Sequence, residues 1–172
     1  GTLDTTFNST GGGGNGHIGI NISRQSDGKI ILVGNFKSFN GVPSYGIVRL
    51  NTDGTKDTSF NIGTGFNNFV NTITIQNDGK ILVGGDFNLY KGALENKIIR
   101  LNSDGSKDTS FNPGGAGFND SINAIVIQND GKILSTFESL SNNFILYRLN
   151  SNGTLDNNFG FGGYVSTYVT GL

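Results

Sequence analysis

The segment Gln76-Asn77-Asp78-Gly79-Lys80-Ile81-Leu82-Val83-Gly84-Gly85 joins a tight turn to an apolar run, and this combination decides the fold. Asn-Asp-Gly-Lys is typical of a hairpin, because glycine readily adopts the left-handed conformation that such turns require. The apolar run after it is too short for a core helix and is rich in β-branched residues, so it predicts a buried strand. The Asp-Gly-Lys motif occurs three times, at residues 27–29, 78–80 and 130–132.

Further blocks recur in the same order around each turn, so the chain consists of three tandem copies of one unit. Each unit predicts short strands joined by turns, with a fourth strand that is weakest in sequence and clearest at residues 163–169. Four strands in about fifty residues match one propeller blade. No long segment has helical periodicity, and we therefore expect an all-β chain. An apolar-Arg-Leu-Asn block stands at 48–51, 99–102 and 147–150, and a Gly-Thr/Ser-x-Asp-x-x-Phe block begins at Gly1, Gly54, Gly105 and Gly153.

Residues 76–85, 100–112 and 153–165 together resemble the delta-60 repeat of bacterial and phage proteins. The resemblance covers nearly the whole chain and rests on several motifs in fixed order. It implies a β-propeller of uncharacterised function, found in large surface or secreted bacterial proteins and in some phage proteins. It implies no catalytic residues. The third unit departs from the pattern after Leu134, where Ser135-Thr136-Phe137-Glu138 replaces the Val-Gly-Gly of the second unit.

The repeats predict a single propeller-like region over residues 1–172. Closed propellers typically have about four to eight blades, whereas this chain supplies three. We therefore expect either an open arc of a larger propeller or closure by self-association, for instance of two chains into six blades. The chain opens on Gly1 and contains no Met, which favours a processed product or a fragment. The expected units are about 2–53, 54–104 and 105–152, with the start of a fourth unit or a closing strand at 153–172.

The composition argues against several classes of function. Lys and Arg total 12 against 13 Asp and Glu, so there is no basic excess of the kind that nucleic-acid binding requires. The chain has no Cys, which excludes disulfides, thiolate metal sites and Cys nucleophiles. No apolar run approaches the roughly 18 residues of a membrane span. The abundance of Gly, 28 residues, is typical of a chain rich in tight turns.

Two patterns of acidic residues are candidate sites. The spacing Asn-x-Asp-Gly-x-x-Asp overlaps that of calcium-binding loops, with Asp53 and Asp57 or Asp104 and Asp108 as ligands. The first ligand position of such a loop would fall on an arginine, so turn formation by Asp and Asn is the favoured interpretation. In the other pattern, each strand arginine is followed eight residues later by an aspartate, which predicts repeated structural ion pairs more readily than a ligand-binding ring of arginines. The predicted pairs are Arg49–Asp57, Arg100–Asp108 and Arg148–Asp156.

His17 is the single histidine, and it follows the glycine run at residues 11–14, which we interpret as a linker. The run is not a phosphate loop, because no Gly-Lys-Ser/Thr follows it. No nucleophile–base constellation stands out from the repeats, so we expect no enzyme activity and no cofactor, with calcium as the one alternative.

Aromatic residues are the remaining candidates for binding. Phe60, recurring in register as Phe111, has the pattern of a core residue. Phe39, Tyr45 and Tyr90 lie in the more variable loops, where stacking on a sugar face is feasible. The favoured function is a non-catalytic scaffold or contact surface for protein or glycan in an extracellular, cell-surface or virion protein. The alternatives are a lectin-like module and, third, a glycan-acting hydrolase.

Overall fold

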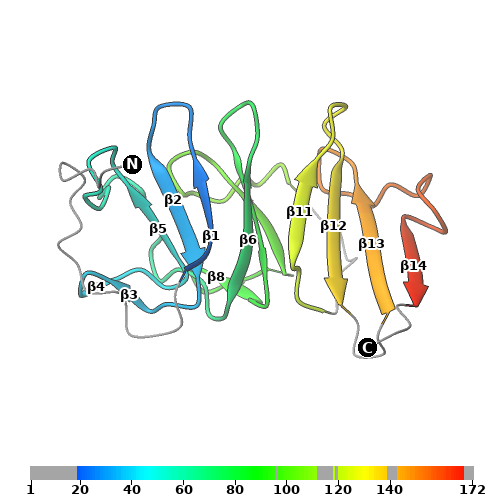
Figure 1. Ribbon diagram of the computed structural model, residues 1–172, viewed down its shortest axis with the longest axis horizontal. Coiled ribbons are helices and arrows are strands. Elements are labelled where there is room, and N and C mark those ends of the chain that lie inside the picture. Colours follow the sequence, from blue (N-terminus) through cyan, green and yellow to red (C-terminus); the bar gives the residue numbers. More distant parts are fainter. Residues whose placement is uncertain (1–18, 96, 112–117, 119, 139–142, 169–172) are drawn as a thin grey trace, which may run out of the picture.

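The computed structural model describes residues 19–95, 97–111, 118, 120–138 and 143–168 (Figure 1). Within these residues all regular elements are β-strands, which confirms the prediction of an all-β chain. The same residues include no helix long and apolar enough to cross a membrane. The glycine run, His17 and the block that begins at Gly1 lie outside the described residues.

Three antiparallel sheets follow one another along the chain and are termed blades 1, 2 and 3. Two short hairpins lie between the second and third strands of blades 1 and 2. Blade 1 consists of β1 (Gly19–Arg24), β2 (Ile30–Gly34) and β5 (Ile47–Leu50), with the hairpin β3 (Ser38–Phe39) and β4 (Val42–Pro43). Blade 2 consists of β6 (Val70–Ile75), β7 (Ile81–Gly85) and β10 (Ile98–Leu101), with the hairpin β8 (Leu89–Tyr90) and β9 (Ala93–Leu94). Blade 3 consists of β11 (Ala124–Ile127), β12 (Ile133–Glu138), β13 (Asn143–Leu149) and β14 (Tyr164–Tyr168).

The Asp-Gly-Lys motif forms the turn between the first two strands of every blade. In blade 1, Gly28 N donates to Gln25 O at 3.0 Å, and Gly28 has a φ of 88°. The Asp27 carboxylate accepts a hydrogen bond from Lys29 N at 3.0 Å and so closes the turn. The turn uses both the aspartate and a left-handed glycine, which explains why the motif recurs unchanged.

The blades lie side by side through their first strands, because β1 contacts β6 and β6 contacts β11. In Figure 1 blades 1 and 3 spread to opposite ends of the molecule, with β6 between them. The apolar core is divided in the same way. One cluster, which includes Ile31, Phe60 and Ile73, lies between blades 1 and 2, and another, which includes Leu82 and Ile125, lies between blades 2 and 3. The sheets of the described residues do not close on themselves, and the arrangement is an open arc.

The fourth strand differs from the expectation in blade 1, while most of the corresponding segment of blade 2 lies outside the described residues. Only blade 3 forms it among the described residues, as β14, where the Tyr-Val-Ser-Thr-Tyr sequence pairs along β13. In blade 1 the corresponding segment instead runs across to the hairpin of blade 2. Phe66 pairs with Tyr90 in an isolated bridge, and Lys91 N donates to Gly65 O at 2.9 Å. The segment therefore connects two blades and is not available to extend one sheet.

Gly85 marks a place where two backbone segments come close together. A Cβ at this position would lie 2.2 Å from the carbonyl oxygen of Phe69, the residue before β6. Asp86 N donates to the same oxygen at 2.8 Å. The small side chain of Gly85 is therefore required by space, whereas Gly79, with a φ of 83° and nothing near its Cβ position, is required by conformation.

We predict that Gly85→Ala destabilises the fold more than Gly79→Ala does. The first substitution forces backbone atoms apart and is expected to cost about 3 kcal/mol. The second places alanine in the left-handed region and is expected to cost about 1 kcal/mol. Urea unfolding followed by circular dichroism measures both values. Equal costs would contradict the close approach at Gly85.

Candidate binding surfaces

Each blade holds a charged cluster of one arginine, one aspartate and one lysine, termed the arginine cluster. In blade 1, Arg49 Nε lies 2.9 Å from Asp57 Oδ2, and Lys29 Nζ lies 2.7 Å from the same oxygen. The Arg49 guanidinium also stacks on the ring of Phe60, with its central carbon 4.6 Å from the ring centroid. The other clusters are Arg100–Asp108 at 2.7 Å with Lys80 at 2.8 Å, and Arg148–Asp156 at 2.7 Å with Lys132 at 2.9 Å.

The first two arginine clusters also reach the next blade. Arg49 Nη1 donates to the backbone carbonyl of Ser103, in the turn after the last strand of blade 2. Arg100 Nη1 donates in the same way to the carbonyl of Ser151, in the corresponding turn of blade 3, at 2.6 Å. Each of these Nη1 atoms also donates to a glutamine of its own blade. Arg49 Nη1 lies 3.3 Å from Gln25 Oε1, and Arg100 Nη1 lies 3.5 Å from Gln76 Oε1. One guanidinium therefore joins two strands of its own blade to the blade that follows.

The arginine clusters perturb the acidity of their aspartates. Burial of the Asp57 carboxylate acts to raise its pKa, but hydrogen bonds from Lys29 and Ser59 and the charge of Arg49 outweigh burial. The pKa of Asp57 is therefore held well below its ordinary value. Asp108 follows the same pattern and also has a strongly lowered pKa. For Asp156 the hydrogen bond from Lys132 is the largest cause of a lowered pKa.

The aspartates considered as calcium ligands make other interactions. Asp53 Oδ1 accepts hydrogen bonds from the backbone N and the hydroxyl of Thr55, at 3.0 and 2.7 Å, and Asp104 does the same with Ser106. These bonds are the turn-forming role that the sequence favours. Among the described residues no three His, Cys, Asp or Glu side chains gather in a group that could hold a metal ion.

The three aromatic residues predicted to contact a ligand have different surroundings. Tyr90 is a core residue, 2% exposed, and its hydroxyl donates to Gly105 O at 2.6 Å. Burial is also the main cause of its raised pKa. The prediction of Tyr90 as a glycan contact is therefore wrong, because the ring packs against Phe66 with centroids 4.7 Å apart. Phe39 is half-buried beside the apolar cluster of blade 1.

Tyr45 is the one of the three that is exposed, and it lies at a pocket of about 470 Å³. Its backbone has a φ of 29°, which is rare for a tyrosine, and its carbonyl accepts a hydrogen bond from Phe66 N at 3.1 Å. The absence of a side chain on Gly65 makes room for Tyr45, because a Cβ there would lie 2.5 Å from the Tyr45 Cβ. The backbone of Tyr45 is therefore held against Gly65 and Phe66, in the segment that connects blades 1 and 2.

Phe69 lies at the same pocket and is 45% exposed, close to the 39% of Tyr45. Sequence reasoning missed Phe69, although it is also an aromatic residue in a loop, which is the signal that indicated Tyr45. Amide side chains surround the two rings: Asn35, Asn67 and Asn68 all line the pocket. Asn68 is held by a 2.8 Å hydrogen bond from its Nδ2 to Asp86 Oδ2.

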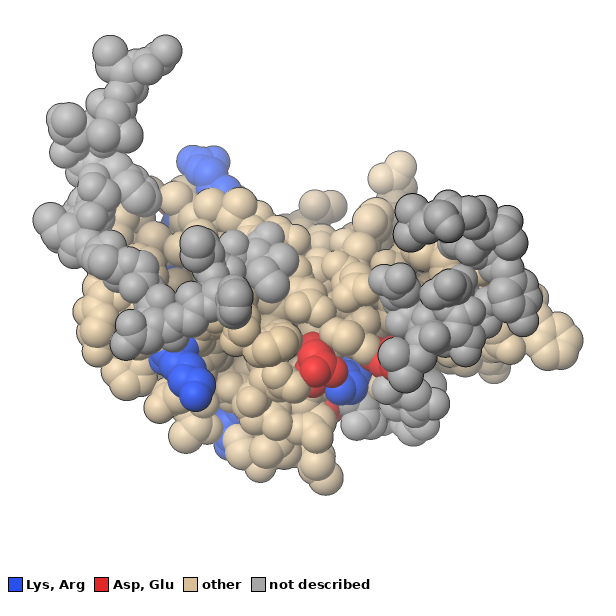
Figure 2. Space-filling view, turned by 60° about the horizontal axis from the view of Figure 1, so that its bottom comes forward, with Lys and Arg blue, Asp and Glu red and all other residues tan. Residues whose placement is uncertain are grey.

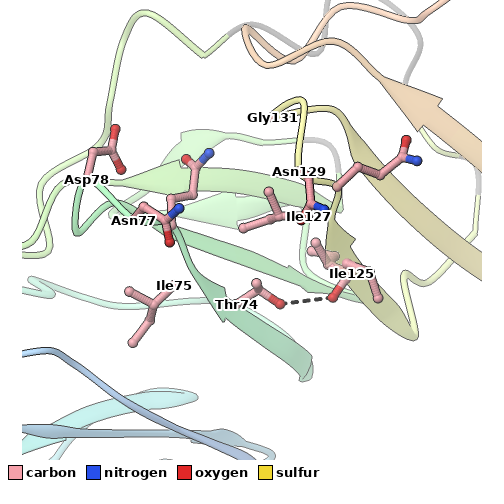
Figure 3. A pocket seen from close by; sticks show the side chains of 11 residues that line it. Thr74, Ile75, Asn77, Asp78, Ile125, Ile127, Asn129 and Gly131 are labelled. Atoms are coloured by element: carbon pink, nitrogen blue, oxygen red, sulfur yellow. Dashed lines mark hydrogen bonds between the residues drawn. The ribbon is translucent and has the colours of Figure 1, made fainter.

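A second kind of hollow lies between the first strands of neighbouring blades. The groove between β6 and β11 has a volume of about 690 Å³ and is lined by polar turn residues such as Asn77 and Asn129, together with Ile75 and Ile127 (Figure 3). Across it, Thr74 Oγ1 donates to Ile125 O at 2.9 Å, the bond drawn in Figure 3. A similar groove of about 520 Å³ lies between blades 1 and 2.

Charged side chains on the face shown in Figure 2 are few, and most of that face is uncharged. A further cross-hairpin pair, Lys97–Asp86 at 2.7 Å, lies beside the loops of blade 2.

Comparison with known families matches the repeats and gives no activity. The model of a family described as a domain of unknown function (DUF5122), beta-propeller, matches residues 25–60, 76–111 and 128–159. Each match begins at the glutamine before the Asp-Gly-Lys turn and ends at or beside the aromatic residue under the arginine cluster. No curated protein matches the chain.

We predict that Arg100→Ala lowers the free energy of unfolding by about 3 kcal/mol, because it leaves Asp108 buried with one cation and removes the bond to Ser151. Lys80→Ala is the matched control. It removes the other cation of the same cluster, whose side chain is 32% exposed, and is expected to cost less than about 1 kcal/mol. Chemical unfolding measures both, and a larger loss for the lysine variant would contradict the assigned role of Arg100.

We also predict a specific acid sensitivity. A lowered folded-state pKa means that the clusters stabilise the fold above the ordinary aspartate pKa of about 3.9, and that this stability is lost as the pH falls through the folded value. The melting temperature should therefore fall steeply below about pH 4. In Asp108→Asn the fall should be shallower. An unchanged slope in that variant would show that Asp108 is not among the groups responsible.

Proposed function

The chain belongs to the DUF5122 β-propeller family, and on that premise we propose that it is a non-catalytic binding module whose ligand site is the pocket beside Tyr45 and Phe69. In this proposal the blades are the scaffold and the loops at one end are the contact surface. The finer resemblance to the delta-60 repeat supports placement of the module in a cell-surface, secreted or virion protein.

The observation that carries the proposal is the pair of exposed aromatic rings at one pocket. Tyr45 and Phe69 are 39% and 45% exposed, whereas Phe66, between them in sequence, is 4% exposed and packs in the core. Exposed aromatic rings on a rigid scaffold are a common feature of binding sites, because they offer contact area at low entropic cost.

A carbohydrate is the ligand class that the lining favours. Asn35, Asn67 and Lys37 line the same pocket as the two rings. Apolar ring faces combined with a few polar groups that fix orientation are the usual composition of a small-ligand site. The alternative ligand is a protein surface, for which the same aromatic residues would serve as anchors.

The test is a glycan array probed with the wild-type chain and with Tyr45→Ala and Phe69→Ala. Each variant is expected to reduce binding about tenfold or more, in line with the loss of a central aromatic anchor. Leu94→Ala is the control, because Leu94 is an apolar side chain, 79% exposed, that does not line the pocket.

Binding that falls equally in Leu94→Ala would contradict the Tyr45 pocket as the site. Absence of binding to any glycan would rule out the carbohydrate ligand. Bound glycans recovered after incubation should be intact, and the appearance of cleavage products would contradict the assignment as non-catalytic.

A further inference from the structure

The two contacts between consecutive blades are built in the same way. The arginine of the earlier blade donates to the turn carbonyl of the later blade, at Ser103 and at Ser151. The aromatic residue under that arginine packs on the glycine of the same turn. A Cβ at Gly105 would lie 3.1 Å from the Phe60 ring, and one at Gly153 would lie 2.9 Å from the Phe111 ring.

Blade 3 has the arginine side of this contact, but no described residue supplies the other side. Arg148 bonds Asp156 and stacks on Phe159 at 4.4 Å, as its equivalents do. No described turn carbonyl accepts from its guanidinium, and the Arg148 side chain is 21% exposed against 7% for Arg49. Gln128 Oε1 is buried without a hydrogen-bond partner among the described residues, whereas the equivalent oxygen of Gln76 lies 3.5 Å from an arginine nitrogen.

The apolar residues on the same face of blade 3 are also uncovered. Leu134 pairs with Arg148 as Leu82 pairs with Arg100, yet Leu82 is fully buried by blade 3 and Leu134 is only partly buried. Val126 takes the strand position of Thr74, whose hydroxyl bonds the next blade, and Val126 is 58% exposed.

Blade 1 has the complementary uncovered residue. Ile22 occupies the strand position of Ile73 and Ile125, which face the preceding blade and are each 5% exposed. Ile22 itself is 61% exposed. The turn of blade 1 that corresponds to the acceptor turns of the other blades carries Thr52 at the position of Ser103.

We propose that the open face of blade 3, formed by Val126, Leu134 and Arg148, binds blade 1 of a second copy of this chain. In this contact the Arg148 guanidinium donates to the Thr52 carbonyl of the second copy, and Val126 packs against its Ile22. The contact continues, between chains, the interface that joins blades 1, 2 and 3 within one chain.

In the proposed dimer both copies make this contact at once. Blades 1 and 3 lie at opposite ends of the arc, with β1, β6 and β11 side by side between them (Figure 1). We place the second copy on a two-fold axis, so that it presents its blade 1 to blade 3 and its blade 3 to blade 1. Two copies of three blades give six, which falls within the size range of closed propellers.

The experiment is light scattering coupled to gel filtration over a range of concentrations, which should give twice the chain mass for the wild type. Val126→Asp and Ile22→Lys each place a charge on an uncovered face without touching the core, and each should yield a monomer. Arg148→Ala removes one charged hydrogen bond of about 1.4 kcal/mol from each of the two contacts of the dimer, so it should weaken association about a hundredfold. Leu94→Asp, on an exposed hairpin position, should remain dimeric.

Mixing Val126→Asp with Ile22→Lys supplies the decisive comparison. In the mixed dimer one contact joins the carboxylate introduced at position 126 of one chain to the ammonium introduced at position 22 of the other. The second contact joins the unchanged Val126 and Ile22. The mixture should therefore recover the dimer that neither variant forms alone. A wild-type chain that stays monomeric at about 1 mM overturns the proposal. A dimer that survives both charged variants overturns it as well. Glycan binding at the Tyr45 pocket is measured separately and does not depend on either result.

Discussion

The structure depends on the hydrogen bonds of the cluster arginines, of which Arg49 and Arg100 are buried and Arg148 is partly exposed. A guanidinium that lies among apolar strands must satisfy its donors, or the cost of burial exceeds the gain from packing. Arg100 meets this requirement with Asp108 in its own blade and the carbonyl of Ser151 in the next. Because one group serves both blades, a blade cannot move away from its neighbour without leaving a buried charge incompletely bonded.

The acceptor in the neighbouring blade is a backbone carbonyl, and this has a consequence for the rest of the surface. A carbonyl is present whatever the residue, so the contact needs only the turn geometry that Asp-Gly or Asn-Gly supplies. Loops elsewhere on the blade are then free to differ. In blade 1 such a loop exposes Tyr45, whereas the nearby Phe66 and Tyr90 are packed into the core between the blades.

Sequence patterns predicted the features that recur and missed those that depend on neighbouring blades. The Asp-Gly-Lys turns and the pairing of Arg49 with Asp57 follow from residues close in the chain, and their recurrence made them visible. The lysine that joins each cluster recurs equally, and it could have been predicted from its fixed place in the turn. The burial of Tyr90 could not, because it arises from contact with Phe66 and Gly105, which no local pattern indicates. The fourth strand of blade 1 is missing for a similar reason, because the segment that would form it pairs with the hairpin of blade 2.

Native-state hydrogen exchange tests most directly whether the arginines join the blades into one cooperative unit. The amides of Asp57, Asp108 and Asp156 each donate to the carbonyl of the cluster arginine in their own blade, and they report on the three blades separately. If the clusters couple the blades, all three amides should exchange through one opening, with the same free energy and the same dependence on denaturant. Three different opening free energies, with blades that open independently, would contradict this account.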